Sequence, residues 1–166
     1  ADVSGKGMNA ALLMAKTTSL LRCLAKTTEG PAELLAQVNA EICETASMGM
    51  FVTIVAGYIY PATGMVELSN AGHQPPVFWH PDSTYEELPA TAPPIGILPD
   101  LPFESTRIEL GDGSLYIFTD GVTESLAPDG TELGVDGLCK IINAQSGSNS
   151  EQRLAEIVER IHDQDR

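Results

Sequence analysis

The stretch FVTIVAGYIY, residues 51–60, decides the fold of this chain. It is rich in β-branched and aromatic residues, which favour strands. Its apolar run is too continuous for a strand with one face in water, so it predicts a strand buried on both faces. Turn residues follow at 61–64, and residues 65–69 then alternate as the partner strand of a hairpin. A core of one sheet packed on another, with helices outside, would bury both faces of residues 51–60.

Helical patterns occupy the two ends of the sequence. Residues 8–28 carry apolar side chains at a spacing of three to four, which predicts a helix that Gly30-Pro31 ends. Pro31 suits the first turn of a second helix, and the short connection predicts an antiparallel pair. Its core side chains are Leu34, Leu35, Val38 and Ile42. Two further helices are predicted near the C-terminus, over residues 136–144 and after a capping box at residues 148–151.

Strand patterns fill the middle of the sequence. Beyond the first hairpin, strands are predicted at 76–79, 84–88, 103–110 and 114–119. Gly111-Asp112-Gly113 predicts that the last two strands form a hairpin. The five prolines of residues 89–102 predict a long ordered loop. Helices, then about six strands, then helices are typical of an α+β fold.

The composition limits the classes of protein that this chain can belong to. Its 166 residues predict a single domain spanning residues 1–166. A net charge of −14 argues against nucleic acid as a partner and is compatible with divalent cations. No apolar run is long enough for a membrane span, and no signal segment starts the chain, so a cytoplasmic location is expected. Cys23, Cys43 and Cys139 show no zinc spacing and are expected to be reduced, buried thiols.

The first residues of the chain combine a carboxylate with a glycine-rich turn. Asp2 precedes a turn at residues 4–7, and a helix of small residues follows. The start of a helix favours anions, so this arrangement suits a site that holds a metal and a phosphate together. An aspartate in this position, taken alone, is more often a turn residue or a helix cap than a functional group. A phosphate-binding loop of the Walker type is excluded, because Lys6 precedes Gly7 where Ser or Thr is required.

A second acidic turn follows the predicted strand at 114–119. Asp120 stands at the end of this strand and precedes Gly121. A carboxylate in this position is either structural or a metal ligand, because the strand fixes the side chain and the glycine leaves room for substrate. Mg²⁺ and Mn²⁺ prefer oxygen ligands, and two or three carboxylates with a carbonyl can hold a pair of these ions.

Other residues are weaker candidates for chemistry. His73 lies between Gly and a Pro-rich turn, and we interpret it as a hydrogen-bonded structural residue. Ser4 has no oriented His-Asp partner to make it a nucleophile. Trp79 is expected in the core or at its rim. Glu124 could orient a metal-bound water, but as an acid opening a helical turn it is expected to be a cap.

Three ordered motifs resemble the metal-dependent protein phosphatases of type 2C. They are DVSGKGMNAA at residues 2–11, NAGHQPP at 70–76 and GDGSLYIFTDGVTE at 111–124. The resemblance is strongest to the bacterial branch named for the sporulation stage II protein E. It implies a four-layer αββα sandwich, in which two packed antiparallel sheets lie between helix pairs. It also implies two Mn²⁺ or Mg²⁺ ions, with Asp2 bridging them, the Val3 carbonyl binding one and Asp120 binding the other.

The sequence departs from this family pattern in three places. The family has an acidic residue on a strand before the first motif and a final aspartate on a strand after the last helix. Neither strand is within these 166 residues, so we expect a fragment that lacks both edge strands. Ser4 stands where eukaryotic members often have His, so no protein general acid can be named.

The resemblance implies a serine/threonine protein phosphatase that uses a two-metal-activated water. It implies a phosphorylated anti-anti-sigma-type protein as substrate, and an upstream sensor or receiver domain on the same polypeptide. The alternative is a catalytically inactive partner-switching or binding module of the same fold. The missing ligands favour this alternative for the fragment, whereas the presence of both Asp2 and Asp120 favours the enzyme. The sequence leaves the oligomeric state open.

Overall fold

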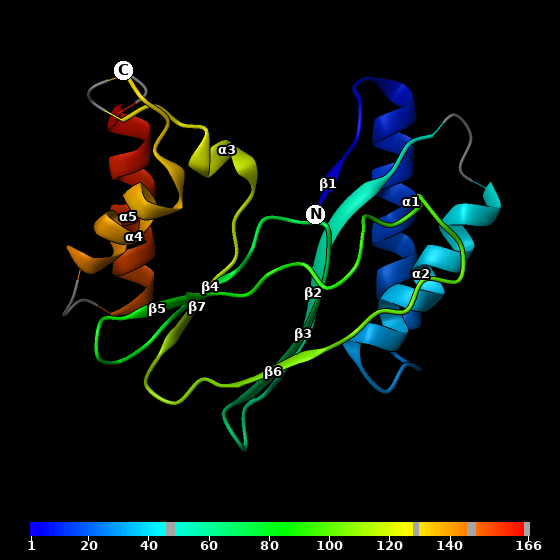
Figure 1. The fold of residues 1–166 in the computed structure, drawn as a ribbon, viewed down its shortest axis with the longest axis horizontal. Coiled ribbons are helices and arrows are strands. Elements are labelled where there is room, and N and C mark those ends of the chain that lie inside the picture. The colour runs from blue at the N-terminus through cyan, green and yellow to red at the C-terminus, as the bar shows by residue number, and fades with distance from the viewer. Residues whose placement is uncertain (46–48, 128–129, 146–148, 165–166) are drawn as a thin grey trace.

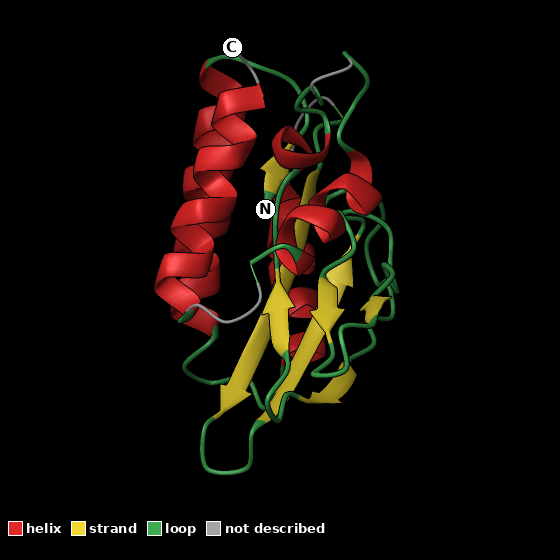
Figure 2. Ribbon diagram, turned by 90° about the vertical axis from the view of Figure 1, so that its left-hand side faces the viewer, coloured by secondary structure: helices red, strands yellow, loops and turns green. Residues whose placement is uncertain are grey.

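The computed structural model describes residues 1–45, 49–127, 130–145 and 149–164. Its elements form four layers, in the order helices, sheet, sheet, helices (Figure 1). This confirms the α+β, αββα prediction. The first sheet has the strand order β1-β2-β3-β6, and the second has the order β5-β4-β7. All pairings within them are antiparallel. Viewed from the side of the C-terminal helices, the strands run roughly from top to bottom (Figure 2).

The bounds of the elements follow the chain in sequence order. The strands are β1 (Asp2–Val3), β2 (Val52–Tyr60), β3 (Met65–Ala71), β4 (Val77–Trp79), β5 (Tyr85–Glu87), β6 (Thr106–Glu109) and β7 (Ser114–Tyr116). The helices are α1 (Met8–Leu24), α2 (Pro31–Thr45), α3 (Asp120–Thr123), α4 (Gly134–Asn143) and α5 (Ser150–Gln164). None of the helices described is long and apolar enough to cross a bilayer.

Three apolar clusters fill the spaces between the four layers. The first joins α1 and α2 to the first sheet, and its fully buried members include Leu35, Val38 and Ile42, as predicted. The second lies between the sheets, where Val66 and Leu68 of β3 meet Phe78 of β4. The third packs α4 and α5 on the second sheet. Burial of this apolar area is the main term that stabilises such layers.

The strand β2 is less buried than its sequence predicts. Ile54 is buried under the helices, while Val55 faces the other sheet. Towards the hairpin, however, Ile59 is 68% exposed and Tyr60 is 40% exposed. The second sheet explains this difference, because its strands have only three residues each and the β2–β3 hairpin projects beyond them (Figure 1). The prediction of burial on both faces is therefore wrong for the second half of β2.

The turn at residues 111–113 does not close a hairpin. β6 pairs with β3 in the first sheet, whereas β7 pairs with β4 in the second. The turn therefore carries the chain from one sheet to the other, and the predicted hairpin is wrong. Gly113 is required there, because a Cβ would lie 2.7 Å from Cε2 of Phe78 and 2.8 Å from the carbonyl oxygen of Trp79. Turn residues show that the chain reverses, but the apolar contacts between layers select the partner strand.

The first helix ends earlier than predicted. α1 stops at Leu24, and the hydroxyls of Thr27 and Thr28 both donate to the Leu24 carbonyl oxygen. Such local side-chain hydrogen bonds compete with continuation of the helix. α2 begins at Pro31 as predicted and runs antiparallel to α1 beside it (Figure 1).

The proline-rich loop at 89–102 is ordered, as predicted. Ile95 exchanges two backbone hydrogen bonds with Val52, with N–O distances of 2.8 and 2.9 Å. The buried Asn39 of α2 accepts from the Gly96 N–H and donates to the Leu98 carbonyl oxygen. The loop thereby covers the end of the first cluster and fixes the start of β2.

The C-terminal helices match the prediction except at the cap. Asn149 Oδ1 accepts from the Gln152 N–H at 2.9 Å, so Asn149 caps α5. Ser148, the predicted start of the capping box, lies outside the described residues. The prediction that the thiols are buried holds for Cys139 but is wrong for Cys23, which is exposed, while Cys43 is intermediate.

Candidate active site

Asp2 lies at the edge of the first sheet. Its two-residue strand β1 pairs with β2, with Asp2 opposite Thr53. Ser4, two residues further along, fixes this edge through two hydrogen bonds with Phe51. The Ser4 N–H donates to the Phe51 carbonyl oxygen at 2.9 Å, and the Ser4 hydroxyl accepts from the Phe51 N–H at 2.8 Å. Ser4 therefore has a structural role, in agreement with the interpretation that it is not a nucleophile. The strand β1 was not predicted, because two residues are too few to show a period.

Asp120 lies where the chain leaves the second sheet. Thr119 is extended, and Asp120 begins the short helix α3. One carboxylate oxygen, Oδ1, accepts from the Gly121 N–H at 2.9 Å, which fixes the half-buried side chain. Glu124 was expected to open a helical turn, but it stands at the C-terminal end of α3, where its N–H donates to the Asp120 carbonyl oxygen. Its side chain is exposed.

His73 follows β3 and contacts segments of both sheets. The ring is buried, with 6% of the residue exposed, and Nδ1 lies 2.9 Å from the hydroxyl oxygen of Thr53. The Phe118 carbonyl also interacts with the ring. Burial lowers the pKa of His73, while the carboxylates of Asp120 and Asp2 both act to raise it. Both carboxylates therefore act electrostatically on one imidazole ring, although Asp2 belongs to the first sheet and Asp120 follows the second.

The segment after β3 presents His73 in this position. Asn70, itself buried, accepts from the His73 N–H at 2.9 Å and donates to the His73 carbonyl oxygen at 3.2 Å. Gly72 has a φ of 66°, and a Cβ there would lie 2.6 Å from Cδ of Pro94. The prediction of a hydrogen-bonded His73 is confirmed. Sequence reasoning missed Thr53 and the clamp formed by Asn70, although an Asn before Ala-Gly-His was a usable signal.

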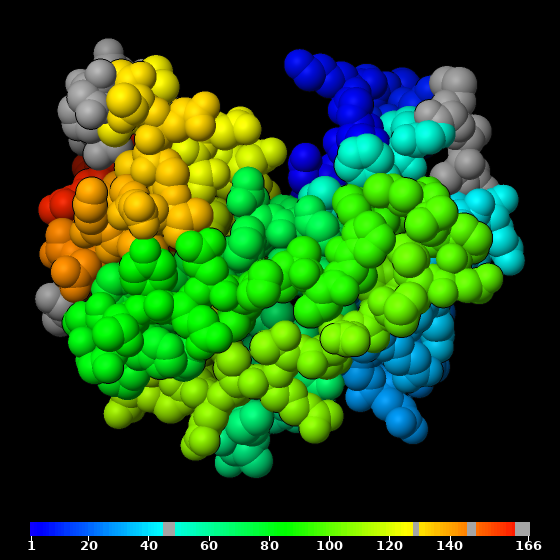
Figure 3. Space-filling view, in the orientation of Figure 1, coloured from blue at the N-terminus to red at the C-terminus, as the bar shows by residue number. Residues whose placement is uncertain are grey.

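A hollow separates the two carboxylate-bearing segments. Figure 3 shows it at the upper edge of the molecule, between the yellow atoms that follow β7 and the blue atoms of the N-terminal segment. In Figure 1, α3 and β1 lie at the same end of the two sheets. Of the two acidic residues that these segments carry, Asp2 is exposed and Asp120 is half-buried.

The candidate donors are all oxygen atoms, which suits a hard divalent cation. They are the carboxylates of Asp2 and Asp120 and the carbonyl of Val3. Within the described ranges, no three His, Cys, Asp or Glu side chains gather as a metal cluster. Oxygen donors of this kind suit Mn²⁺ or Mg²⁺ in their chemistry.

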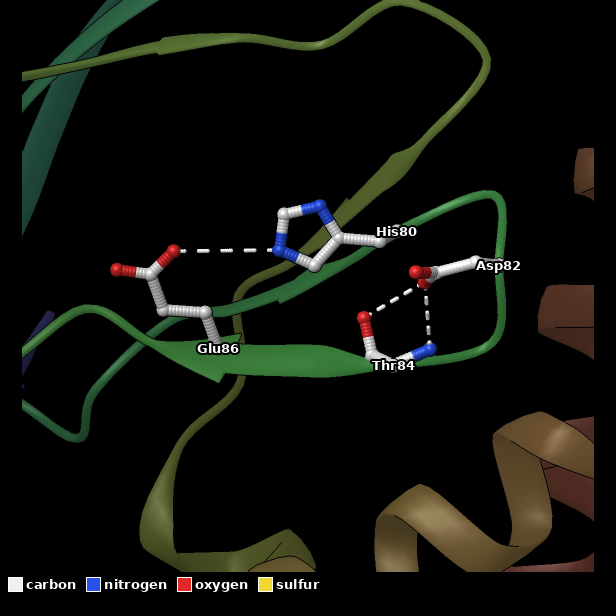
Figure 4. A network of polar contacts seen from close by, with 4 residues as sticks. All are labelled: His80, Asp82, Thr84 and Glu86. Carbon is white, nitrogen blue, oxygen red and sulfur yellow. Dashed lines mark hydrogen bonds and ion pairs between the residues drawn. The ribbon is translucent and has the colours of Figure 1, made fainter.

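A second polar network lies on the hairpin of β4 and β5 and is separate from the cleft. Asp82 Oδ1 accepts from the N–H and hydroxyl of Thr84, and His80 Nε2 lies 3.9 Å from Glu86 (Figure 4). The hydrogen bonds from Thr84 lower the pKa of Asp82. Trp79 stacks on Tyr85 at 5.8 Å and packs on the third cluster, as expected for a residue at the rim of the core. This network fixes the hairpin turn.

Comparison with known protein families shows which family the chain belongs to. The family described as Stage II sporulation protein E (SpoIIE) matches residues 1–166. The chain belongs to the SpoIIE family. Among curated relatives, the SpoIIE-family domain is 29% identical over 160 residues to phosphoserine phosphatase RsbU of Bacillus subtilis, covering 95% of this chain and 47% of RsbU. It is 30% identical over 132 residues to phosphoserine phosphatase RsbP of the same organism, covering 76% of this chain and 32% of RsbP.

Solved structures share the SpoIIE-family fold. The structure of the PP2C phosphatase domain of SpoIIE from Bacillus subtilis, with a fragment of its regulatory domain, has a TM-score of 0.76 at 16% identity. It covers 96% of this chain and 47% of that one. The RsbU and RsbW domains of Rv1364c from Mycobacterium tuberculosis give 0.72 at 23% identity, with coverage of 96% and 45%. The chain spans less than half the length of each of these four relatives. The match to the family and the shared fold confirm the predicted resemblance.

Proposed function

We propose that residues 1–166 form one phosphatase domain that hydrolyses phosphoserine or phosphothreonine on a regulatory protein. One observation carries this proposal: β1, which holds Asp2, and α3, which begins at Asp120, lie at the same end of the two sheets although they are far apart in sequence (Figure 1). The carboxylates of both residues also act to raise the pKa of the buried His73. Oxygen ligands are the kind that divalent cations prefer, and phosphoryl-transfer sites commonly use such cations in pairs. Kinship with RsbU and RsbP, named as phosphoserine phosphatases, supports the same reaction class.

Asp2, the Val3 carbonyl and Asp120 would hold two Mn²⁺ or Mg²⁺ ions. Further ligands would be the acidic residues that the family carries on its two edge strands. When bound, such ions supply a nucleophilic water near neutral pH and neutralise charge on the phosphoryl oxygens. The residues of this chain orient the ligands. The Gly121 N–H donates to one carboxylate oxygen of Asp120. The antiparallel pairing of β1 with β2 fixes the backbone of Asp2 and Val3. His73 contacts Thr53, which stands opposite Asp2, and interacts with the Phe118 carbonyl, which precedes Asp120 by two residues.

The substrate that we propose is a phosphorylated anti-anti-sigma-type protein in the cytoplasm. The relatives support this, because Rv1364c carries an RsbW domain beside its RsbU domain on one polypeptide. A sensor or receiver domain upstream on the same polypeptide would regulate the site, as the regulatory domain in the SpoIIE structure suggests. The net charge of −14 argues against nucleic acid as a partner.

The test uses the full-length protein that contains this chain. Phosphate release from a phosphoserine peptide is measured with Mn²⁺, with Mg²⁺, and after chelation with EDTA. We expect turnover with either metal and its loss on chelation. Metal-independent turnover would contradict the two-metal mechanism. No turnover, combined with stable binding of the phosphorylated partner, would favour the alternative of an inactive binding module.

A further inference from the structure

A pocket of about 260 Å³ lies where the β2–β3 hairpin meets β6, and we call it the hairpin pocket. Its lining includes Tyr60, Met65, Glu67 and Arg107. Asp2 pairs near the start of β2, whereas Tyr60 is the last residue of that strand. In Figure 1 the hairpin is at the lower end of β2 and β3, and β1 is beside the upper end. The hairpin pocket is therefore separate from the carboxylate site.

The hairpin pocket contains a carboxylate that is almost fully withdrawn from water. Glu67 is 9% exposed, which is rare for a glutamate, because a charge that leaves water has to be paired. The side chain lies on the helix-facing side of β3, where its Oε1 would be 3.6 Å from a Cβ added to Gly30. Within the part of the chain that the structure describes, Arg107 is its one ionic partner.

Arg107 binds Glu67 in a way that an arginine from another protein can copy. The two residues stand opposite each other in the pairing of β3 with β6. Nε of Arg107 lies 3.2 Å from Oε2, and Nη2 donates to Oε1 at 3.4 Å, so the guanidinium spans both carboxylate oxygens. The Arg107 side chain is 70% exposed, however, against 12% for Glu67. An ion pair with so exposed a cation contributes little to stability, so its exchange for another guanidinium costs little.

The rim of the hairpin pocket is held in shape by backbone hydrogen bonds. The N–H groups of Thr63 and Gly64 donate to the Tyr60 carbonyl oxygen at 3.1 and 2.9 Å. The Leu110 N–H donates to the Gly64 carbonyl oxygen at 2.9 Å, which holds the turn against the end of β6. Tyr60 is 40% exposed, so an aromatic ring is accessible beside the carboxylate. A planar guanidinium can stack on such a ring while it pairs with a carboxylate.

We propose that the hairpin pocket is a docking site for an arginine side chain from a basic segment of a partner protein. The incoming guanidinium replaces Arg107 on Glu67 and stacks on Tyr60, while Arg107 turns into water. The net charge of −14 attracts a basic partner. Glu109, which is exposed and pairs with Met65, adds a negative charge beside the pocket. This docking does not depend on the proposed function, because it uses no residue of the carboxylate site.

The test titrates the full-length protein with two short peptides. One is acetyl-glycyl-arginyl-glycine amide, and the other has citrulline in place of arginine, which exchanges the guanidinium for a neutral urea of similar shape. Binding is followed by NMR of ¹³C-labelled methionine methyl groups, and the Met65 signal is assigned with Met65→Leu. We expect the arginine peptide to shift the Met65 signal and the citrulline peptide to leave it unchanged. Equal shifts with both peptides would overturn the proposal.

Three variants test the exchange of one guanidinium for another. Glu67→Gln keeps the shape and should abolish the preference for arginine over citrulline. Arg107→Gln removes the internal competitor and should tighten binding of the arginine peptide by roughly two- to fivefold, the factor that corresponds to an exposed ion pair. Glu109→Gln removes a charge outside the pocket and should change the affinity by less than about twofold, because exposed charges are screened.

Melting temperatures show whether the three variants are folded. Should Glu67→Gln fail to fold, Arg107→Gln still decides the question, because the Arg107 side chain is largely in water and its removal leaves the core intact. An affinity for the arginine peptide that is no higher in Arg107→Gln than in the wild type would overturn the proposal. A folded Glu67→Gln variant that still prefers arginine over citrulline would do the same.

Discussion

Thr53 and His73 form the contact on which the geometry of the candidate site depends. The Thr53 hydroxyl oxygen lies 2.9 Å from Nδ1 of His73, and Thr53 stands opposite Asp2 in the pairing of β1 with β2. The same ring interacts with the Phe118 carbonyl, two residues before Asp120. One buried side chain thus connects the strand that pairs with Asp2 to the segment that carries Asp120. A loosened His73 would let the two carboxylates move relative to one another.

Removal of this contact should reduce stability. We expect His73→Ala to lower the free energy of unfolding by about 2–4 kcal/mol, because it leaves a cavity and an unpaired Thr53 hydroxyl. Thr53→Val keeps the shape and should cost about 1–2 kcal/mol. Urea unfolding of both single variants and the double variant measures the coupling, which should exceed about 0.5 kcal/mol. Strictly additive losses, or a normal stability with a large loss of turnover, would contradict the structural role of His73.

Removal of either candidate ligand should abolish turnover and leave the fold intact. Asp2→Asn and Asp120→Asn keep the side-chain shape and remove the charge that would bind a cation. We expect each to lower kcat by about 10³-fold or more, equal to roughly 4 kcal/mol of barrier. The control is Asp112→Asn, the same substitution in the exposed turn at 111–113. Undiminished turnover in either ligand variant of the full-length protein would remove that residue from the site.

The sequence predicted local structure well because the signals for it are local. The spacing of Leu34, Leu35, Val38 and Ile42 identified the buried face of α2, and the turn at 61–64 identified the β2–β3 hairpin. The predicted hairpin at 111–113 failed because its glycines fit a turn between sheets equally well. Partner choice depends on contacts with Phe78 and Trp79, which are distant in sequence.

The candidate site was predictable only in part, for the same reason. Asp2 and Asp120 stood out because each precedes a glycine-containing turn. The contact between Thr53 and His73 joins residues 20 positions apart, and no periodic pattern marks it. His73 was therefore predicted to be hydrogen-bonded, but its contact with Thr53 and its interaction with the Phe118 carbonyl depend on how segments distant in sequence pack together.

The three cysteines should differ in reactivity, in the order of their exposure. Cys23 is exposed, Cys43 is intermediate and Cys139 is buried. Titration of the native protein with a thiol reagent should modify Cys23 first and Cys139 only on unfolding. The single variants Cys23→Ser and Cys139→Ala assign the phases. Fast modification of Cys139 in the native protein would contradict the packing of α4 against the second sheet.

Alkaline pH should destabilise the protein through the contact between Tyr85 and α4. Burial raises the pKa of the Cys139 thiol from 9.0 to about 11. The hydrogen bond to Asp136 raises the pKa of Tyr85 from 10.0 to about 12. The folded state holds the protons of both groups more tightly than the unfolded chain does. The stability that these protonated groups give the folded state is therefore fully present below pH 9. It is lost as the pH rises towards 11 for Cys139 and towards 12 for Tyr85. Urea midpoints across this range should fall less steeply for Cys139→Ala than for the wild type.

Two glycines with nearly the same backbone conformation should respond differently to substitution. Gly64 and Gly72 have φ values of 69° and 66°, so alanine is strained at both. At Gly64 the nearest atom to a new Cβ is the Gly111 nitrogen at 4.0 Å, whereas at Gly72 the Cγ and Cδ atoms of Pro94 would lie at 2.6 Å. We expect Gly64→Ala to cost about 1 kcal/mol, the value for the left-handed conformation alone. Gly72→Ala adds overpacking and should cost about 2–4 kcal/mol in total.

The two substitutions should also differ in their effect on turnover, with Gly72→Ala the more harmful. Gly72 directly precedes His73, and Pro94 belongs to the loop that holds the start of β2 through Ile95. A Cβ at position 72 therefore pushes apart the two segments that position the ring. In the full-length protein we expect Gly72→Ala to lower both the melting temperature and the turnover, and Gly64→Ala to leave turnover unchanged. Equal effects of the two substitutions on stability would show that backbone strain alone matters, and that Pro94 can move without disturbing His73.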